Sequence, residues 1–100
     1  MNIIHQISTN RFKVELDGYT GYVDYRLTDG KLDIRHTIVP PEIGGRGIAG
    51  ALVKAAYDFA LQNKLRCVAT CSYAVKWLEQ HPEYEGEKGC DYAGEESCAL

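Results

Sequence analysis

Two sequence patterns meet in Val39-Pro40-Pro41-Glu42-Ile43-Gly44-Gly45-Arg46-Gly47-Ile48-Ala49-Gly50, where a strand-like run ends at two prolines and a helical pattern begins near Gly47. A glycine-rich loop at a helix N-terminus exposes backbone N–H groups that have no partner within the helix. These groups and the helix dipole attract phosphate, and Arg46 adds a positive charge. The loop has neither the Gly-Lys-Ser/Thr triplet of a P-loop nor the spaced glycines of a dinucleotide-binding motif. The sequence therefore predicts an anion-binding loop, with a plain strand-to-helix turn as the alternative.

The residues before this loop alternate apolar and polar side chains, as β-strands do. The dipeptides Asp17-Gly18 and Asp29-Gly30 separate the alternating runs, and such dipeptides favour tight hairpin turns. We therefore predict antiparallel strands over 11–16, 20–27 and 31–39. In the last of these, Ile34 and Ile38 are expected on the apolar side.

After the loop the apolar residues recur at helical spacing from Gly47 to Asn63. A short apolar run over 65–71 predicts a strand, and Ser72 is placed to cap a second helix through Gln80. The expected fold is α/β, with a mixed, mainly antiparallel sheet of about five strands and two main helices. We predict a domain over 1–84 and a loosely ordered, acidic, glycine-containing tail over 85–100.

The composition and charge of the chain argue against nucleic acid and membranes as partners. The chain has 100 residues and a formal net charge of -3, which gives no general attraction for nucleic acid or an anionic membrane. No apolar run approaches the roughly 20 residues that span a bilayer, and the N-terminus has no signal-peptide pattern. We expect a cytoplasmic protein, a monomer or weak dimer, without nucleic-acid or membrane partners.

Three ordered motifs resemble one known family. The loop resembles the pyrophosphate loop of the GNAT superfamily of coenzyme A-dependent N-acetyltransferases, whose pattern is Gln/Arg-x-x-Gly-x-Gly/Ala. Gly47 and Ala49 match that pattern, whereas Gly44 stands where Gln or Arg is usual. With the segments 35–41 and 68–84, the loop looks like the minimal single-domain GNAT-like family often labelled YjdJ-like.

The resemblance implies acetyl-coenzyme A or coenzyme A as the cofactor. In GNAT-type proteins a strand separates from its neighbour beside the cofactor, and its backbone bonds the pantetheine arm. By position that strand is 33–39, with the amides of Ile38 and Val39 as candidates. The full set of expected cofactor-binding residues is Ile38, Val39, Gly44, Gly45, Arg46, Gly47, Ile48, Ala49, Gly50 and Tyr73.

The resemblance also points to His36 and Cys71 as catalytic residues. Histidine suits a general base because its ordinary pKa is close to neutral pH. Either Cys71 accepts the acetyl group as a thioester, or His36 deprotonates an amine that attacks directly. The expected reaction is acetyl transfer to an unidentified amine, on a small molecule or a protein. A non-catalytic module that binds coenzyme A or acyl-coenzyme A is the alternative.

The spacing of the cysteines argues against a metal site. Its ligands would be drawn from Cys67, Cys71, Cys90, Cys98 and His81. On one strand Cys67 and Cys71 would be about 13 Å apart, at roughly 3.3 Å per residue, which is too far to share one zinc ion. We therefore predict no metal.

Overall fold

The first four strands form an antiparallel meander in the computed structural model, which describes residues 2–88. These strands are β1 (Ile3–Gln6), β2 (Arg11–Leu16), β3 (Tyr19–Thr28) and β4 (Lys31–Ile38). The predicted hairpin turns are present, because Asp17, Gly18, Asp29 and Gly30 all have positive φ angles, between 50° and 81°. Two consecutive residues with positive φ make the turn type whose twist matches that of the flanking strands.

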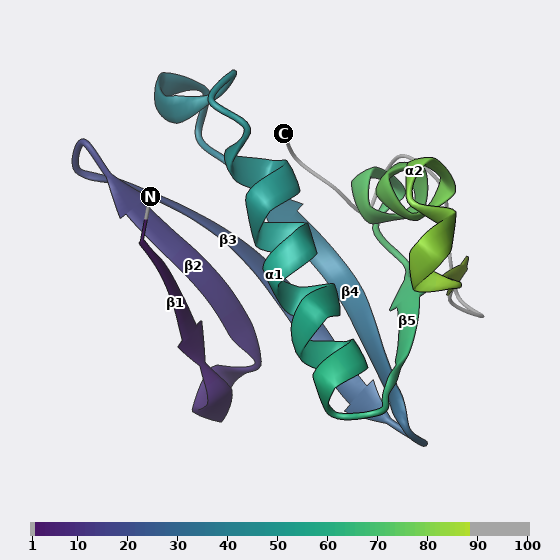
Figure 1. The fold of residues 1–100 in the computed structure, drawn as a ribbon. Coiled ribbons are helices and arrows are strands. Elements are labelled where there is room, and N and C mark those ends of the chain that lie inside the picture. Colours follow the sequence, from purple (N-terminus) through teal and green to yellow (C-terminus); the bar gives the residue numbers. More distant parts are fainter. Residues whose placement is uncertain (1, 89–100) are drawn as a thin grey trace.

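The second half of the chain adds a parallel crossover. Helix α1 (Ile48–Gln62) leads to β5 (Arg66–Ala69), which pairs parallel to β4. Helix α2 (Ser72–Gln80) follows, and the short strand β6 (Glu87–Lys88) pairs parallel to β5. The result is an α/β fold with a six-stranded mixed sheet in the order β1-β2-β3-β4-β5-β6. Figure 1 shows α1 lying across one face of the sheet and α2 beside β5.

The main core lies between α1 and the sheet. Leu52, Val53 and Ala56 of α1 are fully buried, as are Val23 and Ile34 of the facing strands. Burial of each large aliphatic side chain stabilises the fold by about 1.5–3 kcal/mol. The helix that follows the glycine loop is therefore held firmly on the sheet, and its N-terminus has a fixed position.

A bulge in β4 changes which side chains face this core. Tyr25 pairs with Ile34 but Asp24 pairs with His36, so Arg35 is the extra residue. Downstream of the bulge the alternation is reversed. Thr37 and Val39 are buried, whereas Ile38 is half-buried and lies outside the core cluster. The prediction that Ile38 shares the apolar side with Ile34 is therefore wrong, because an inserted residue shifts a period-two pattern by one.

The sheet has an additional strand at each edge that the sequence analysis did not predict. β1 lies in the first six residues, and β6 lies within the segment predicted as a tail. The sheet thus continues past residue 84, and residues 89–100 lie outside the described residues. No helix among residues 2–88 is long and apolar enough to cross a membrane.

Candidate functional site

The glycine loop begins with a turn anchored by a buried side chain and continues with two glycines that have positive φ angles. A short 3-10 turn, Pro41–Ile43, follows β4, and its Ile43 side chain is fully buried. Beyond it the backbone has positive φ at Gly45 (76°) and Gly47 (74°), a conformation that glycine adopts without steric cost. The two glycines therefore let the chain reverse direction and enter α1 within a few residues.

The N-terminus of α1 carries no cap from a side chain. Gly47 occupies the N-cap position, and the first turn holds no acidic residue. The N–H of Ala51 makes a helical bond, 3.0 Å from the carbonyl oxygen of Gly47. The amides of residues 47–50 precede this bond and have no acceptor within the helix. They form a positive helix end suited to an anion.

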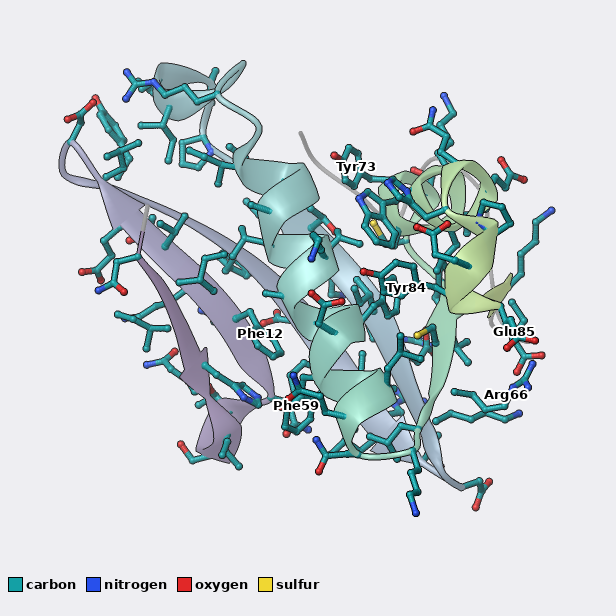
Figure 2. All side chains as sticks on the ribbon, viewed as in Figure 1. Phe12, Phe59, Arg66, Tyr73, Tyr84 and Glu85 are labelled. Carbon is teal, nitrogen blue, oxygen red and sulfur yellow. The ribbon has the colours of Figure 1, made fainter. Side chains whose placement is uncertain are left out.

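A cavity of about 360 Å³ opens beside this helix end. One wall comes from the end of β4 and the loop, another from the first turn of α1, and a third from Tyr73 of α2. Figure 2 labels Tyr73 on the side of α2 that is next to α1. A Cβ atom at Gly50 would lie 3.3 Å from the hydroxyl oxygen of Tyr73, so the two helices meet closely there. Burial raises the pKa of Tyr73, which stays a neutral hydroxyl at physiological pH. The lining residues are Val39, Pro41, Gly44, Gly45, Gly47, Ile48, Ala49, Gly50 and Tyr73.

Eight of the ten residues expected to bind the cofactor line this cavity, and Ile38 and Arg46 are not among its lining residues. The guanidinium of Arg46 instead forms an ion pair with Asp17 in the β2–β3 turn, with Nη1 2.8 Å from Oδ2. Sequence reasoning found the loop because glycines and its place before a helix are local signals. It missed the partner of Arg46, which lies 29 residues away.

Next to the cavity, the last residues of β4 extend beyond the end of β5, and the space beside them is called the gap below. The pairing of the two strands ends at Ile34 and Ala69, whereas β4 continues to Ile38 and the chain after β5 turns into α2. The carbonyl oxygen of Ile34 accepts bonds from the N–H groups of Thr70 (3.0 Å) and Cys71 (3.2 Å) where this pairing ends. All four residues of β5 pair with β4, so the space beside the last residues of β4 arises because β5 ends there, and the expected separation of paired strands stays a prediction.

One short distance shows which backbone amides at the end of β4 point toward β3 and which point toward the gap. The carbonyl oxygen of Ile38 lies 3.5 Å from the Cβ position of Gly21 on β3, so Ile38 faces β3. In an antiparallel pair the N–H and C=O of one residue point to the same side. The amide of Ile38 therefore belongs to the sheet, and the amides of Thr37 and Val39 face the gap. Thr37 was not identified from the sequence, because only the bulge brings it into this position.

His36 and Cys71 lie on opposite faces of the sheet. His36 is exposed and pairs with Asp24, whose carboxylate binds Arg11 on the face away from α1. Cys71 is fully buried on the α1 side, and its Sγ lies 3.3 Å from the hydroxyl oxygen of Thr37. The structure records Cys71 as disulfide-bonded, and sulfur in that state has no thiolate. A thioester on Cys71 therefore requires the reduced protein.

A buried polar cluster lies where the pairing of β4 and β5 ends. The Thr70 hydroxyl lies 2.9 and 3.0 Å from the two carboxylate oxygens of Asp33, and Arg35 lies 3.1 Å from the same carboxylate. Hydrogen bonds to a buried carboxylate are costly to break. This cluster was not identified from the sequence, because Thr70 and Asp33 lie 37 residues apart and Asp33 occupies an ordinary polar position of an alternating strand.

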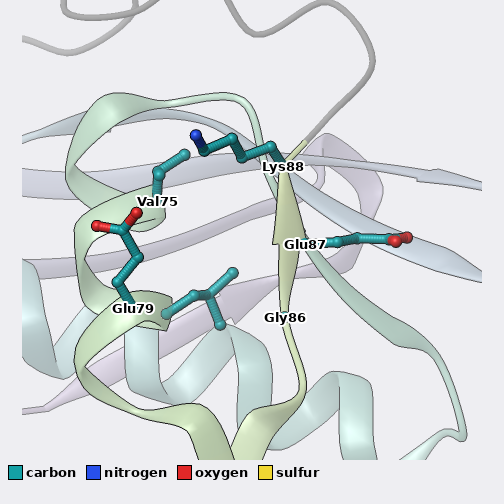
Figure 3. Close-up of a pocket in the computed structure, with 6 residues that line it drawn as sticks. Val75, Glu79, Gly86, Glu87 and Lys88 are labelled. Carbon is teal, nitrogen blue, oxygen red and sulfur yellow. The ribbon is translucent and has the colours of Figure 1, made fainter.

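A second, smaller cavity lies elsewhere and is drawn in Figure 3. It has a volume of about 160 Å³ and lies between α2 and β6, lined by Val75, Leu78, Glu79, Gly86, Glu87 and Lys88. It shares no lining residue with the cavity at the glycine loop. The loop cavity is larger and lies at an open helix N-terminus, so we treat it as the candidate functional site.

The described part of the chain contains no group of three or more His, Cys, Asp or Glu residues placed to hold a metal ion. Cys67, one of the candidates weighed above, is a buried free thiol. Burial raises its pKa to about 11, which makes it a poor source of thiolate. Cys90 and Cys98 lie outside the described residues.

Comparison with known proteins gives a consistent result. The sequence profile described as GCN5-related N-acetyl-transferase matches residues 11–87. Protein NATD1 of Bos taurus is 35% identical, over 82% of this chain and 75% of the relative. Protein NATD1 of Homo sapiens is 34% identical with the same coverage. The NMR solution structure of a GCN5-like protein from Staphylococcus aureus superposes with a TM-score of 0.68 at 31% identity, over 88% of this chain and 87% of that one.

Proposed function

The chain belongs to the GCN5-related N-acetyltransferase family, and on that basis we propose that it binds acetyl-coenzyme A and transfers the acetyl group to an amine. The observation that carries this proposal is the cavity at the N-terminus of α1, which is lined by eight residues of the predicted cofactor loop and its surroundings. Membership of the narrower YjdJ-like group stays a prediction.

The pyrophosphate of the cofactor would lie against the amides of residues 47–50. These amides are not used by the helix, and the first turn carries no acidic side chain that would repel an anion. Gly44 gives no side chain where the superfamily has Gln or Arg, so the backbone is expected to supply most of the binding. The small residues Gly47, Ala49 and Gly50 allow close approach of the phosphates.

The pantetheine arm would run along the gap beside the end of β4. The amides of Thr37 and Val39 face this gap and are the donors we assign to the arm and the thioester. A donor aimed at the thioester oxygen stabilises the negative charge that develops as the carbonyl is attacked, by about 3 kcal/mol. Thr37 takes the place expected for Ile38, because the carbonyl of Ile38 faces β3.

The acceptor amine would approach from the sheet face that carries His36. An amine with a pKa near 10.4 is largely protonated at neutral pH, and His36 would remove its proton. The amine nitrogen then bonds to the carbonyl carbon, the carbon–sulfur bond breaks, and the thiolate of coenzyme A leaves and takes up a proton. We favour this direct route because His36 and Cys71 lie on opposite sheet faces.

Binding is tested by calorimetry with acetyl-coenzyme A and coenzyme A on the wild type and a matched pair of variants. Ala49 is half-buried in the first turn of α1 and lines the cavity. Ala49→Glu adds a charge that favours the helix N-terminus and opposes pyrophosphate, whereas Ala49→Gln adds similar bulk without charge. We expect Ala49→Glu to bind at least about tenfold more weakly than Ala49→Gln without loss of thermal stability. Absence of binding to the wild type, or equal binding by both variants, would overturn the proposed site.

Catalysis is tested separately from binding. Release of coenzyme A thiol is followed with a panel of amines that includes polyamines and lysine-containing peptides, under reducing conditions. We expect turnover by the wild type, and its loss in His36→Gln with unchanged cofactor binding. Cofactor binding without thiol release for any amine would instead support the non-catalytic binding module. Trapping of an acetyl group on Cys71 would support the thioester route, which full activity of Cys71→Ala would exclude.

We further propose that the protein acts in the cytoplasm as a monomer or weak dimer, on a small-molecule or protein amine. The net charge of -3 suits a cationic acceptor.

A further inference from the structure

The single arginine of the cofactor loop is already bound to a carboxylate. Nη1 of Arg46 lies 2.8 Å from Oδ2 of Asp17, across 29 residues of chain. Both side chains are about half exposed, at 48% and 59% of their surface. The pair is therefore accessible to water and to any ligand that enters the neighbouring cavity.

The backbone of Asp17 lies in the β2–β3 hairpin turn. Asp17 and Gly18 both have positive φ, which defines a tight turn between two paired strands. The hairpin also lies against the start of α1. A Cβ atom placed on Gly21 of β3 would be 3.3 Å from Cγ2 of Ile48. Asp17 is thus positioned by the turn between two paired strands, within reach of Arg46.

Arg46 itself stands between two residues that line the cavity. Gly45 and Gly47 both contribute to the wall, and both have positive φ, whereas Arg46 is absent from the lining. Its charge is therefore next to the phosphate position but directed to Asp17. The arginine side chain is long and flexible, and its guanidinium binds phosphate and carboxylate alike.

We propose that Asp17 controls the affinity of the loop for phosphate-bearing ligands by competing for Arg46. Without a ligand, Asp17 holds the guanidinium away from the cavity. When a pyrophosphate occupies the amides of residues 47–50, Arg46 leaves Asp17 and binds the phosphate oxygens. This inference rests on the proposed function, because it takes the ligand to be coenzyme A or its acyl form.

The exchange is favourable on electrostatic grounds. An exposed carboxylate–arginine pair is weak, because water and salt screen it and two side chains are held in one geometry. A pyrophosphate carries more charge and several acceptor oxygens, and the helix amides hold it close to Arg46. Asp17 therefore lowers the affinity without preventing binding, and its effect decreases as salt increases.

The test measures the dissociation constant of coenzyme A for the wild type, Asp17→Asn, Arg46→Gln and the double variant by calorimetry, at low and high salt. Asparagine tolerates positive φ, so the turn is retained, and circular dichroism checks the fold of each variant. We expect Asp17→Asn to bind about two- to fivefold more tightly at low salt, with a smaller difference at high salt. Arg46→Gln should bind more weakly, and the double variant should match Arg46→Gln.

The outcomes separate this inference from the proposed function. If the wild type binds coenzyme A and Asp17→Asn binds equally or more weakly, the competition is overturned and the proposed function stands. If Asp17→Asn also tightens binding in the Arg46→Gln background, the carboxylate acts by its charge alone and the exchange is overturned. If none of the four proteins binds coenzyme A, both proposals fall.

Discussion

The hydroxyl of Tyr57 in α1 donates a hydrogen bond to the carbonyl oxygen of Val68 in β5, at a distance of 2.7 Å inside the core. Tyr57 is fully buried, and burial is the main reason that its pKa lies well above the ordinary value. The bond joins the helix that follows the glycine loop to the strand that leads into α2. It therefore helps to hold α1 on the part of the sheet next to the candidate site.

Tyr57→Phe removes this bond to the buried Val68 carbonyl. We expect the free energy of unfolding to fall by about 1–3 kcal/mol, because a buried carbonyl loses this hydrogen bond. Urea unfolding measures the loss. Tyr19→Phe is the matched control, since Tyr19 is 41% exposed and the same change there should have little effect. Equal stability of the two variants would contradict the assigned role of this bond.

Gly50→Ala is expected to separate stability from binding. Alanine favours the helix by about 0.5–1 kcal/mol over glycine, but its Cβ would lie 3.3 Å from the Tyr73 hydroxyl within the cavity wall. We expect an unchanged or higher melting temperature and weaker binding of coenzyme A. Tyr73→Phe in the same background removes the crowding oxygen and should restore part of the affinity. Unchanged affinity in Gly50→Ala would show that this part of the cavity is not used.

Gly86→Ala is expected to destabilise the contact between α2 and β6. A Cβ atom at Gly86 would lie 2.4 Å from Cδ1 and 2.7 Å from Cγ of Leu78, so the side chain or the strand must move. Such overpacking costs about 1–3 kcal/mol. In a Leu78→Ala background the same substitution should cost much less, because the clashing atoms are gone. Thermal unfolding of the four proteins measures the coupling, and equal costs in both backgrounds would refute the clash.

Stability is expected to fall as the pH drops below 7 because of His5. Its ring stacks on Phe12, with centroids 3.9 Å apart, and its Nε2 lies 2.5 Å from the Tyr25 hydroxyl oxygen. Burial lowers the pKa of His5 below 6.5 in the folded protein, so the unfolded chain takes up the proton first. The His5 contribution is complete above pH 6.5, decreases as the pH falls through that value, and levels off below the folded pKa.

Urea unfolding between pH 5 and 8 would measure this dependence, with His5→Phe as the control. Phenylalanine keeps a ring against Phe12 but does not titrate. The difference in unfolding free energy between the wild type and His5→Phe should therefore shift against the wild type at low pH. A difference that is constant over this range would exclude His5 as the cause.

Local signals were enough to predict much of the fold. Asp17-Gly18 and Asp29-Gly30 are hairpin turns because few other dipeptides tolerate two consecutive positive φ angles. The second helix spans residues 72–80 and ends before Pro82, as predicted, but its N-cap is Cys71 and the predicted cap, Ser72, is its first residue. β1 was missed because Ile3–Gln6 is a short edge strand without flanking turn signals. β6 has only two residues and depends on pairing with β5.

Local sequence features were enough to predict the glycine loop, its place between a strand and a helix, and most of the residues that line the cavity. These features depend on backbone freedom and periodicity, which neighbouring residues decide. Tertiary structure alone decided that the bulge at Arg35 turns Thr37 inward and Ile38 outward, because strand pairing sets the register. It also decided that Arg46 binds Asp17 and that His36 and Cys71 occupy opposite faces. Each of these depends on segments distant in the chain that only folding brings together.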